Sequence, residues 1–562
     1  MDGVESTGTT IGILLAGVAV VVGGVLLLRL HAFLALLLGA LLVGALTPPG
    51  AVERFALEKD ALKILGTDPG ARSVTLPAAD PQAIPVGTPF LLVRRSSATG
   101  RYEAVARLAV ERHVSDGAGK TGAVARIEGD GVLPAPRDLV VPPYALARAR
   151  KAVDQSVGER VAAGFGGTAT SIGILIAMAS IVGLCLLQSG AADRIVRTAL
   201  RLTGEAGAPL AFLLSGFLLG VPVFFDTVFY LMIPLGKALG MRTGRCYLFY
   251  VLTIVAGGTM AHSLVPPTPG PLFVAEQLNV SIGAMMVAGT VVGLASSAFG
   301  YFFARLANER WPVPLRDSLE MPLEQLQALS KRAEHELPPF WLAVIPIVLP
   351  VVLLGGSAMA EAAGWEPSAP LRPWVQAGSD KNIALALAAL IALLTLAWQR
   401  RPSREELSES VRGAVTSAGE IILITAAGGA FGAVLQQTGV AGLVSELPRS
   451  SPAVLLTLAF LITTAIRTAQ GSATVAMITA VGVLSGLAAD GLGFHPVYLA
   501  LAIGCGSKPI AWMNDSGFWV ITRMSGMTEA ESLRSVTPMT ALMGVVGLLV
   551  TLVLATLFPT PF

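Results

Sequence analysis

The chain has 562 residues, of which 53% are hydrophobic and only 14% are charged. This composition excludes a soluble globular domain and predicts a polytopic membrane protein. The net charge of +2 argues against a nucleic-acid partner, and the three cysteines lie in apolar segments, which argues against a disulfide framework.

The first apolar run follows MDGVESTGTT, which lacks the basic n-region of a secretory signal. We therefore expect membrane helices at about 11–29 and 32–48, so that 1–50 forms part of a scaffold. Residues 51–153 are charged and turn-rich, with alternating patterns in SVTLPAAD, PFLLVRR, YEAVARLAVERHV and TGAVARIEGD. These patterns predict a small β-rich extracytoplasmic insertion, either a solvated decoration or a partner-binding or gating cap.

Two apolar segments, 209–240 and 451–490, are too long for one membrane pass, because a helix crosses roughly 30 Å of hydrocarbon in about 20 residues. Gly-Val-Pro and Asp226 interrupt the first, whereas Arg467, Gln470 and Gly471 interrupt the second. Each segment predicts a re-entrant hairpin of two short helices. We expect broken helices at 246–280 and 497–524.

Further membrane helices are expected near 169–189, 283–304, 340–360, 382–399, 417–438 and 537–558. The fold class is therefore an all-α polytopic membrane protein with about ten spanning helices plus two hairpins. The charged stretch 311–338 predicts a cytoplasmic surface helix between the halves.

Lysine and arginine clusters should lie in the cytoplasm, which places both termini and the 51–153 insertion outside the cell. The two hairpins then enter from opposite faces, as in an inverted-topology repeat. The two halves are similar in sequence: the segment LLQSGAADRIV (186–196) resembles LQQTGVAGLV (435–444), and 246–270 resembles 497–519 at an offset of about 251 residues. The first repeat spans 154–310 and the second 401–562, with scaffold helices in 339–400.

The chemistry should lie at four breaks, VPVFFD (221–226), AHSLVPPTPGP (261–271), RTAQGSAT (467–474) and MNDSGF (513–518). Unwound backbone is tolerated at membrane depth only where it lines a buried or water-filled cavity. Helix ends there attract anions through free N–H groups and cations through free carbonyls. Since a charge at the bilayer centre costs about 2.5–3.5 kcal/mol, the charged residues in these runs predict pairing or use.

Together, GVPVFFD, AHSLVPPTPGP, RTAQGSATVA and NDSGFW resemble the gluconate permease family, the gluconate:proton symporters of the ion transporter superfamily. The resemblance covers about 154–558 and the first two helices. It implies proton-coupled uptake of sugar acids such as gluconate, or of D-serine in some members, and a homodimer with a scaffold and a moving transport domain. Ala511-Trp512-Met513 and Pro266-Pro267-Thr268-Pro269 depart from the family's Ser-His-Val and Pro-Pro-His-Pro, so His262 is the only histidine in these motifs.

The expected substrate-binding residues are Asp226, Ser263, Thr268, Gly270, Arg467, Gln470, Gly471, Ser472, Asn514 and Ser516. Arg467 either clamps a substrate carboxylate or locks the hairpin to backbone carbonyls. The amide and hydroxyl side chains either contact a polyhydroxy acid or cap helices.

Asp226, His262 and Asp515 are candidates for ion coupling, and the alternative is a capping or structural role. Lys508 either meets a substrate carboxylate or neutralises Asp515.

The sequence thus predicts a proton-driven secondary transporter of a small hydroxylated carboxylate in the inner membrane, with no cofactor and no metal. The alternatives are a sodium-coupled carboxylate or dicarboxylate carrier, a D-serine-type permease and a substrate sensor. A membrane enzyme using His262 and Asp515 is disfavoured, because no nucleophile or metal-ligand motif accompanies them.

Overall fold

The computed structural model describes residues 7–62, 64–68, 72–77, 84–96, 99–115, 121–128, 134–135, 138–243, 246–316, 334–365, 368, 370–439, 452–488, 492–513 and 515–560. The chain divides into two compact units. The first comprises 1–18, 39–163 and 433–443, and the second comprises 19–38, 164–432 and 444–562.

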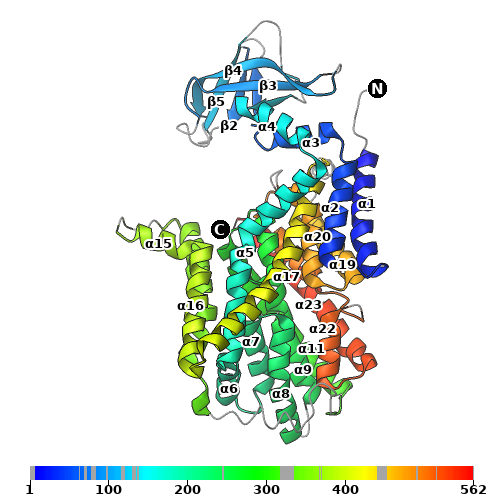
Figure 1. The fold of residues 1–562 in the computed structure, drawn as a ribbon, viewed down its shortest axis with the longest axis vertical. Helices are drawn as coiled ribbons and strands as arrows, with labels where there is room; N and C mark the ends of the chain where they lie inside the picture. Colours follow the sequence, from blue (N-terminus) through cyan, green and yellow to red (C-terminus); the bar gives the residue numbers. More distant parts are fainter. Residues whose placement is uncertain are drawn as a thin grey trace. The chain divides into compact units, whose positions relative to one another are not determined.

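The first unit contains a six-stranded antiparallel sheet in the order β1-β2-β5-β4-β3-β6 (Figure 1). The strands are β1 (Gly66–Asp68), β2 (Ser73–Pro77), β3 (Pro89–Arg95), β4 (Tyr102–Ser115), β5 (Thr121–Glu128) and β6 (Leu139–Val141). Val74, Leu76, Leu92 and Leu108 are buried on one face, as the alternating pattern requires. The β-rich region is confirmed, and the four expected strands correspond to β2 through β5. β1 and β6 have only three residues each, too few to show a period.

Both ends of the expected β segment are helical, which corrects the prediction there. α3 (Pro49–Glu58) and α4 (Pro143–Asp154) each begin with proline, whose fixed φ suits the first helical turn. They pack together through Leu57, Ala145 and Ala149.

The chain enters and leaves the sheet at one place. The Leu62 backbone N–H donates to the Val140 carbonyl at 2.8 Å, and Arg148 pairs with Asp60 at 3.2 Å. The strands between these points therefore form a module with adjacent ends.

The remaining helices are drawn in Figure 1; α1, α2, α5 and α17 are each divided between the two units, and the others belong to the second unit. In chain order they are α1 (Thr7–Leu26), α2 (Ala32–Leu46), α5 (Val157–Gln188), α6 (Ala191–Thr203), α7 (Ala208–Gly220), α8 (Phe225–Thr243), α9 (Tyr247–Leu264), α10 (Pro269–Gln277), α11 (Ile282–Arg310), α13 (Phe340–Pro350), α14 (Gly356–Ala362), α15 (Arg372–Ser379), α16 (Lys381–Arg400), α17 (Arg404–Gln436), α19 (Pro452–Gln470), α20 (Ala473–Ala488), α21 (Val497–Gly506), α22 (Ser516–Ser525) and α23 (Glu529–Leu557). A π-helical turn, Val351–Gly355, joins α13 to α14.

Within the described residues, eight helices are long and apolar enough to cross a membrane, or nine if α2 and α3, bent by 101°, form one span. The expected number was about ten. The difference arises because the apolar stretch Gly8–Gly24 of α1 is too short, α21 and α22 are each too short alone, and α2 passes only with α3. Conversely, Pro452–Gln470 is long enough by itself to span, although half a hairpin was expected there.

Two spans begin well before the expected residues 169 and 417, because each starts with a capping box. Ser156 and Glu159 exchange hydrogen bonds of 2.7 and 3.2 Å at the start of α5. Ser403 and Glu406 do the same, at the same distances, before α17. The S-x-x-E motif is readable in the sequence and explains the polar first turns.

Most of the expected linker helix at 311–338 lies outside the described residues. Its described end carries a 3₁₀ turn, Glu334–Glu336.

α7 crosses α9 at very close range and runs in the same direction. Gly216 lies against Ile254, and one turn later Gly220 lies against Ala261. Glycine is needed at these crossings because each backbone approaches the other helix directly.

α8 packs against the same helix in the opposite direction. Gly240 lies against Tyr247, whereas Phe225 at the start of α8 lies against Gly258. α7 and α8 therefore fold back on each other around residues 221–224. Entry of this pair from a single membrane face stays a prediction.

The C-terminal helices repeat these relations. α19 and α20 both pack against α21, and α23 packs against α21 as α11 packs against α9. The short helix after the break in each half packs against a helix of the other half: α10 packs against α20, and α22 packs against α8. Gly270 meets Met477 at the first contact, and Gly517 meets Phe225 at the second.

Candidate functional site

The four expected breaks coincide with four helix ends in the structure. α7 stops at Gly220, α9 at Leu264, α19 at Gln470 and α21 at Gly506. The chain resumes as α8, α10, α20 and α22 after breaks of two to nine residues. Gly471 takes a left-handed φ of +78°, which suits glycine in such a tight turn.

A cavity of about 240 Å³ lies among these breaks, and Val536 and Thr540 of α23 also line it. Seven of the expected site residues line it, namely Asp226, His262, Arg467, Ser472, Lys508, Asp515 and Ser516. The volume is below the roughly 300–1,000 Å³ of drug-sized ligand sites, so the cavity suits a small molecule.

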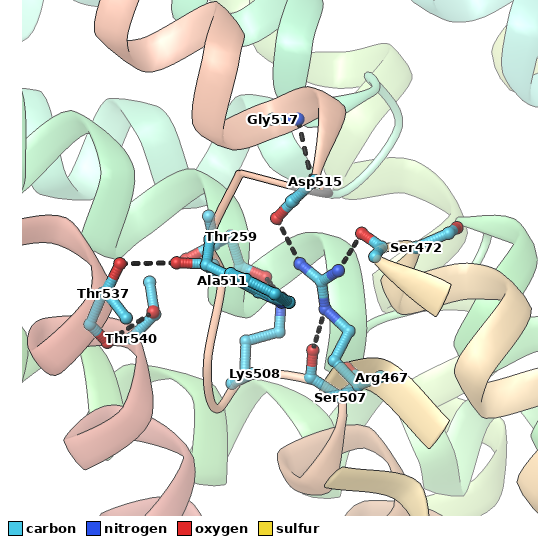
Figure 2. Close-up of polar contacts among 12 residues, drawn as sticks. Thr259, Arg467, Ser472, Ser507, Lys508, Ala511, Asp515, Gly517, Thr537 and Thr540 are labelled. Carbon is cyan, nitrogen blue, oxygen red and sulfur yellow. Dashed lines mark hydrogen bonds and ion pairs between the residues drawn. The ribbon is translucent and has the colours of Figure 1, made fainter. Parts of the chain in front are cut away.

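Arg467, at the end of α19, is 4% exposed, and each of its three guanidinium nitrogens has a partner. Its Nε donates to the Ser507 carbonyl at 3.1 Å, its Nη1 to the Gly471 carbonyl and its Nη2 to Asp515 (Figure 2). The Asp515 carboxylate also accepts the Gly517 backbone N–H at 2.9 Å and thereby caps α22. One guanidinium thus joins the tip between α19 and α20 to the break between α21 and α22.

Lys508 lies in the same wall but has different partners. Its ammonium donates to the Thr259 carbonyl at 2.8 Å, and the residue is 6% exposed. Among the described residues, the ion pair of Asp515 comes from Arg467 and not from Lys508.

The two carboxylates approach each other across Gly517. A methyl group built on Gly517 would lie 3.4 Å from the Asp515 Oδ1 and 3.7 Å from the Asp226 Oδ1. The ion pairs found in the described part of the chain include Asp515 but not Asp226. His262 packs its ring edge-on against Phe224, with 5.9 Å between ring centroids, and its buried Nδ1 has no partner there.

Five expected substrate residues do not line the cavity. Thr268 donates its hydroxyl to the Val265 carbonyl at 2.8 Å, and Gly270 is pressed against Met477. The Gly471 carbonyl is occupied by Arg467. Ser263 and Gln470 are buried, and their side-chain polar atoms have no partner among the described residues. Asn514 lies outside the described residues.

The sequence interpretation missed the hydroxyls of Thr259, Thr474 and Thr540 and the aromatic wall of Phe224, Phe225 and Phe518. The sequence did contain a signal for Thr474, because it holds the same position in its helix as a predicted site residue. Thr474 is the second residue of α20, and Asp226 is the second residue of α8. Thr540 lies inside a plain spanning helix, and only the packing of α23 brings it to the cavity.

Trp512, at a position where the motif departs from the family, is 39% exposed and does not line the cavity. Its indole N–H donates to the Thr468 carbonyl at 3.1 Å. Trp512 therefore connects the break to α19. In the described parts of the chain, no group of three His, Cys, Asp or Glu side chains could hold a metal ion.

Helices long enough to cross a membrane, together with a small polar cavity at unwound breaks, define this chain as a multi-pass membrane protein. The fold is similar to the crystal structure of the Alcanivorax borkumensis YdaH transporter, with a TM-score of 0.51 and 14% sequence identity, over 84% of this chain and 94% of that chain.

The sequence model of the GntP family permease matches residues 139–557. The chain belongs to this family and is a membrane permease, which confirms the resemblance seen in the motifs. Most of the β sheet precedes the matched region.

Curated relatives agree. The inner membrane permease YgbN of Escherichia coli K12 is 31% identical over 70% of this chain and 88% of its own length. A gluconate permease of Pseudomonas aeruginosa is 31% identical over 70% of this chain and 86% of its length. The Gnt-II system L-idonate transporter of Escherichia coli K12 is 28% identical, over 70% and 88%. All three are permeases or transporters rather than enzymes.

Proposed function

We propose that this permease carries a small hydroxylated carboxylate of the gluconate kind into the cell, driven by protons, across the inner membrane. The observation that carries the proposal is the cavity itself. It combines two cations, Arg467 and Lys508, with the hydroxyls of threonine and serine residues in a volume suited to a small molecule.

The cations suit a carboxylate, and the hydroxyls suit a polyhydroxy chain. The names of the relatives point the same way, since they include gluconate permeases and an L-idonate transporter. The carboxylates of Asp226 and Asp515 in the same cavity offer sites for a coupling proton.

Alternating access between two inverted repeats is part of the proposal. Its support is the reciprocal exchange in which α10 packs against α20 and α22 against α8, because a two-fold relation between the halves requires paired contacts of this kind. The arginine and lysine distribution supports cytoplasmic loops that leave both termini and the β insertion outside. A homodimer follows from the superfamily resemblance alone.

The test is uptake of labelled gluconate into proteoliposomes under an imposed pH gradient, with sodium present or absent. We expect accumulation that follows the pH gradient and ignores sodium. Related sugar acids, dicarboxylates and D-serine serve as competitors and rank the substrates. Accumulation that follows a sodium gradient instead would replace proton symport with sodium coupling. Absence of both uptake and counterflow for all of these compounds would remove the proposed function.

A further inference from the structure

Four charged side chains face the cavity, and their hydrogen bonds separate them into two kinds. Arg467 and Asp515 bind each other and the backbone on both sides of the cavity, whereas Lys508 and Asp226 do not bind each other or that pair. This difference, rather than residue type, indicates which groups are available to a ligand.

We propose that Arg467 and Asp515 are a fixed structural pair, and that Lys508 and Asp226 are the working pair, which take the substrate carboxylate and the coupling proton respectively. The proposal rests on the proposed function and assigns roles within its site. It reverses the first expectation for Arg467, which was to clamp the substrate.

The case for a fixed pair begins with the donors of Arg467. Its three nitrogens already serve the Ser507 carbonyl, the Gly471 carbonyl and Asp515 (Figure 2). A carboxylate that used the same guanidinium edge would have to displace Asp515. That exchange would leave Asp515 buried without its cation and would free the N-terminus of α22. Breaking such a buried pair is strongly unfavourable.

Lys508 has the opposite situation. An ammonium group has three N–H donors, and the described structure gives it one acceptor, the Thr259 carbonyl at 2.8 Å. The carbonyl fixes the ammonium in the cavity wall, between α9 and the break after α21. The remaining N–H groups can donate to an anion without the loss of any existing hydrogen bond.

Asp226 is the corresponding acid. It lines the cavity at the start of α8 and lies across Gly517 from Asp515. The other charged and titratable groups facing this cavity are His262 from α9, Arg467 from α19, and Lys508 and Asp515 around the break between α21 and α22. Because Arg467 already serves Asp515, protonation of Asp226 removes a like charge from beside Asp515 without breaking an ion pair.

The test compares four variants of the full chain in detergent and in proteoliposomes: Lys508→Met, Asp226→Asn, Arg467→Met and Asp515→Asn. Thermal unfolding reports structure, counterflow reports substrate binding and translocation, and accumulation under a pH gradient reports coupling. Glucitol, the uncharged polyol, serves as a competitor that lacks the carboxylate.

We expect Lys508→Met to unfold near the wild-type temperature but to weaken gluconate binding about 10- to 100-fold, as loss of a charged hydrogen bond does. Its preference for gluconate over glucitol should collapse. Asp226→Asn should lose accumulation driven by the pH gradient by a much larger factor than it loses counterflow. Arg467→Met and Asp515→Asn should each unfold at lower temperature, and the double variant should recover part of the loss, because no unpaired charge remains.

The proposal is overturned if Lys508→Met keeps the wild-type preference for gluconate, or if His262→Gln rather than Asp226→Asn is the variant that uncouples transport. It is also overturned if Arg467→Met unfolds like the wild type and loses only the preference for the carboxylate. Failure of the wild-type protein to transport any hydroxy acid would instead overturn the proposed function, so the two failures are distinguishable.

Discussion

Replacing Gly257 by alanine tests whether the breaks are positioned by direct backbone contact between α7 and α9. A Cβ at Gly257 would lie 2.1 Å from the Leu213 carbonyl oxygen and 2.8 Å from the Phe217 nitrogen. Ordinary contact begins at 3.4 Å, so the oxygen is about 1.3 Å too close. Both neighbours are backbone atoms of another helix, and neither can rotate away.

The helices must therefore separate, at a cost of about 1–3 kcal/mol or more for overpacking of this kind. Thr259 and His262 follow Gly257 on the same helix and line the cavity, so the displacement also reaches the site. We expect Gly257→Ala to unfold at a clearly lower temperature than the wild type in detergent and to lose most uptake in proteoliposomes.

Two matched substitutions calibrate the result. Gly506 is the corresponding crossing in the second half, and its Cβ would lie 2.5 Å from the Phe460 carbonyl oxygen, a smaller overlap. Gly356 is an exposed glycine of α14 with nothing within 4 Å of a Cβ. The expected order of destabilisation is Gly257→Ala, then Gly506→Ala, with Gly356→Ala neutral or slightly stabilising because alanine favours a helix. If all three variants unfolded at the wild-type temperature, close backbone contact would not be what positions the breaks.

Three further predictions concern the parts around the site. Replacing 64–138 by a short glycine-serine linker should leave the rate of gluconate uptake unchanged, since Leu62 and Val140 are already hydrogen-bonded neighbours; loss of uptake in a folded deletion variant would make the β sheet a functional cap. Gln470→Leu should raise the unfolding temperature, because both buried polar atoms of the amide lack partners in the described structure. A raised KM for gluconate in this variant would show that the substrate is the partner of the amide, and an unchanged KM would remove this residue from the site. Asn514→Ala should abolish uptake with folded protein retained, and normal uptake kinetics in that variant would exclude the expected contact.

The positions of the breaks were predictable from the sequence because the bilayer imposes them. Segments 209–240 and 451–490 exceed one membrane thickness, and glycine, proline and charged residues cannot continue an apolar helix without compensation. The helix ends at Gly220 and Gln470 follow from these local rules. The early starts of α5 and α17 were also predictable from local sequence, because each start is marked by an S-x-x-E capping-box motif.

The partners of the charged residues were not predictable in this way. Lys508 lies seven residues before Asp515 in sequence, whereas Arg467 lies 48 residues before it, so closeness along the chain favours the cation that does not form the pair. The ion pair goes to Arg467 because α19 packs against α21 and presents the guanidinium to Ser507 and Asp515 together. Lys508 is left facing the Thr259 carbonyl on α9, a contact that spans 249 positions in sequence.

The sequence by itself determined the membrane class, the family, the β-rich insertion and the four places where the helices break, because hydrophobic length, alternation and helix-breaking residues act over short stretches of chain. Only the tertiary structure decided which polar groups share a cavity and which are already bound to each other. Those choices depend on helix crossings such as Gly257 on Leu213 and Gly270 on Met477, which bring together residues that no local pattern relates.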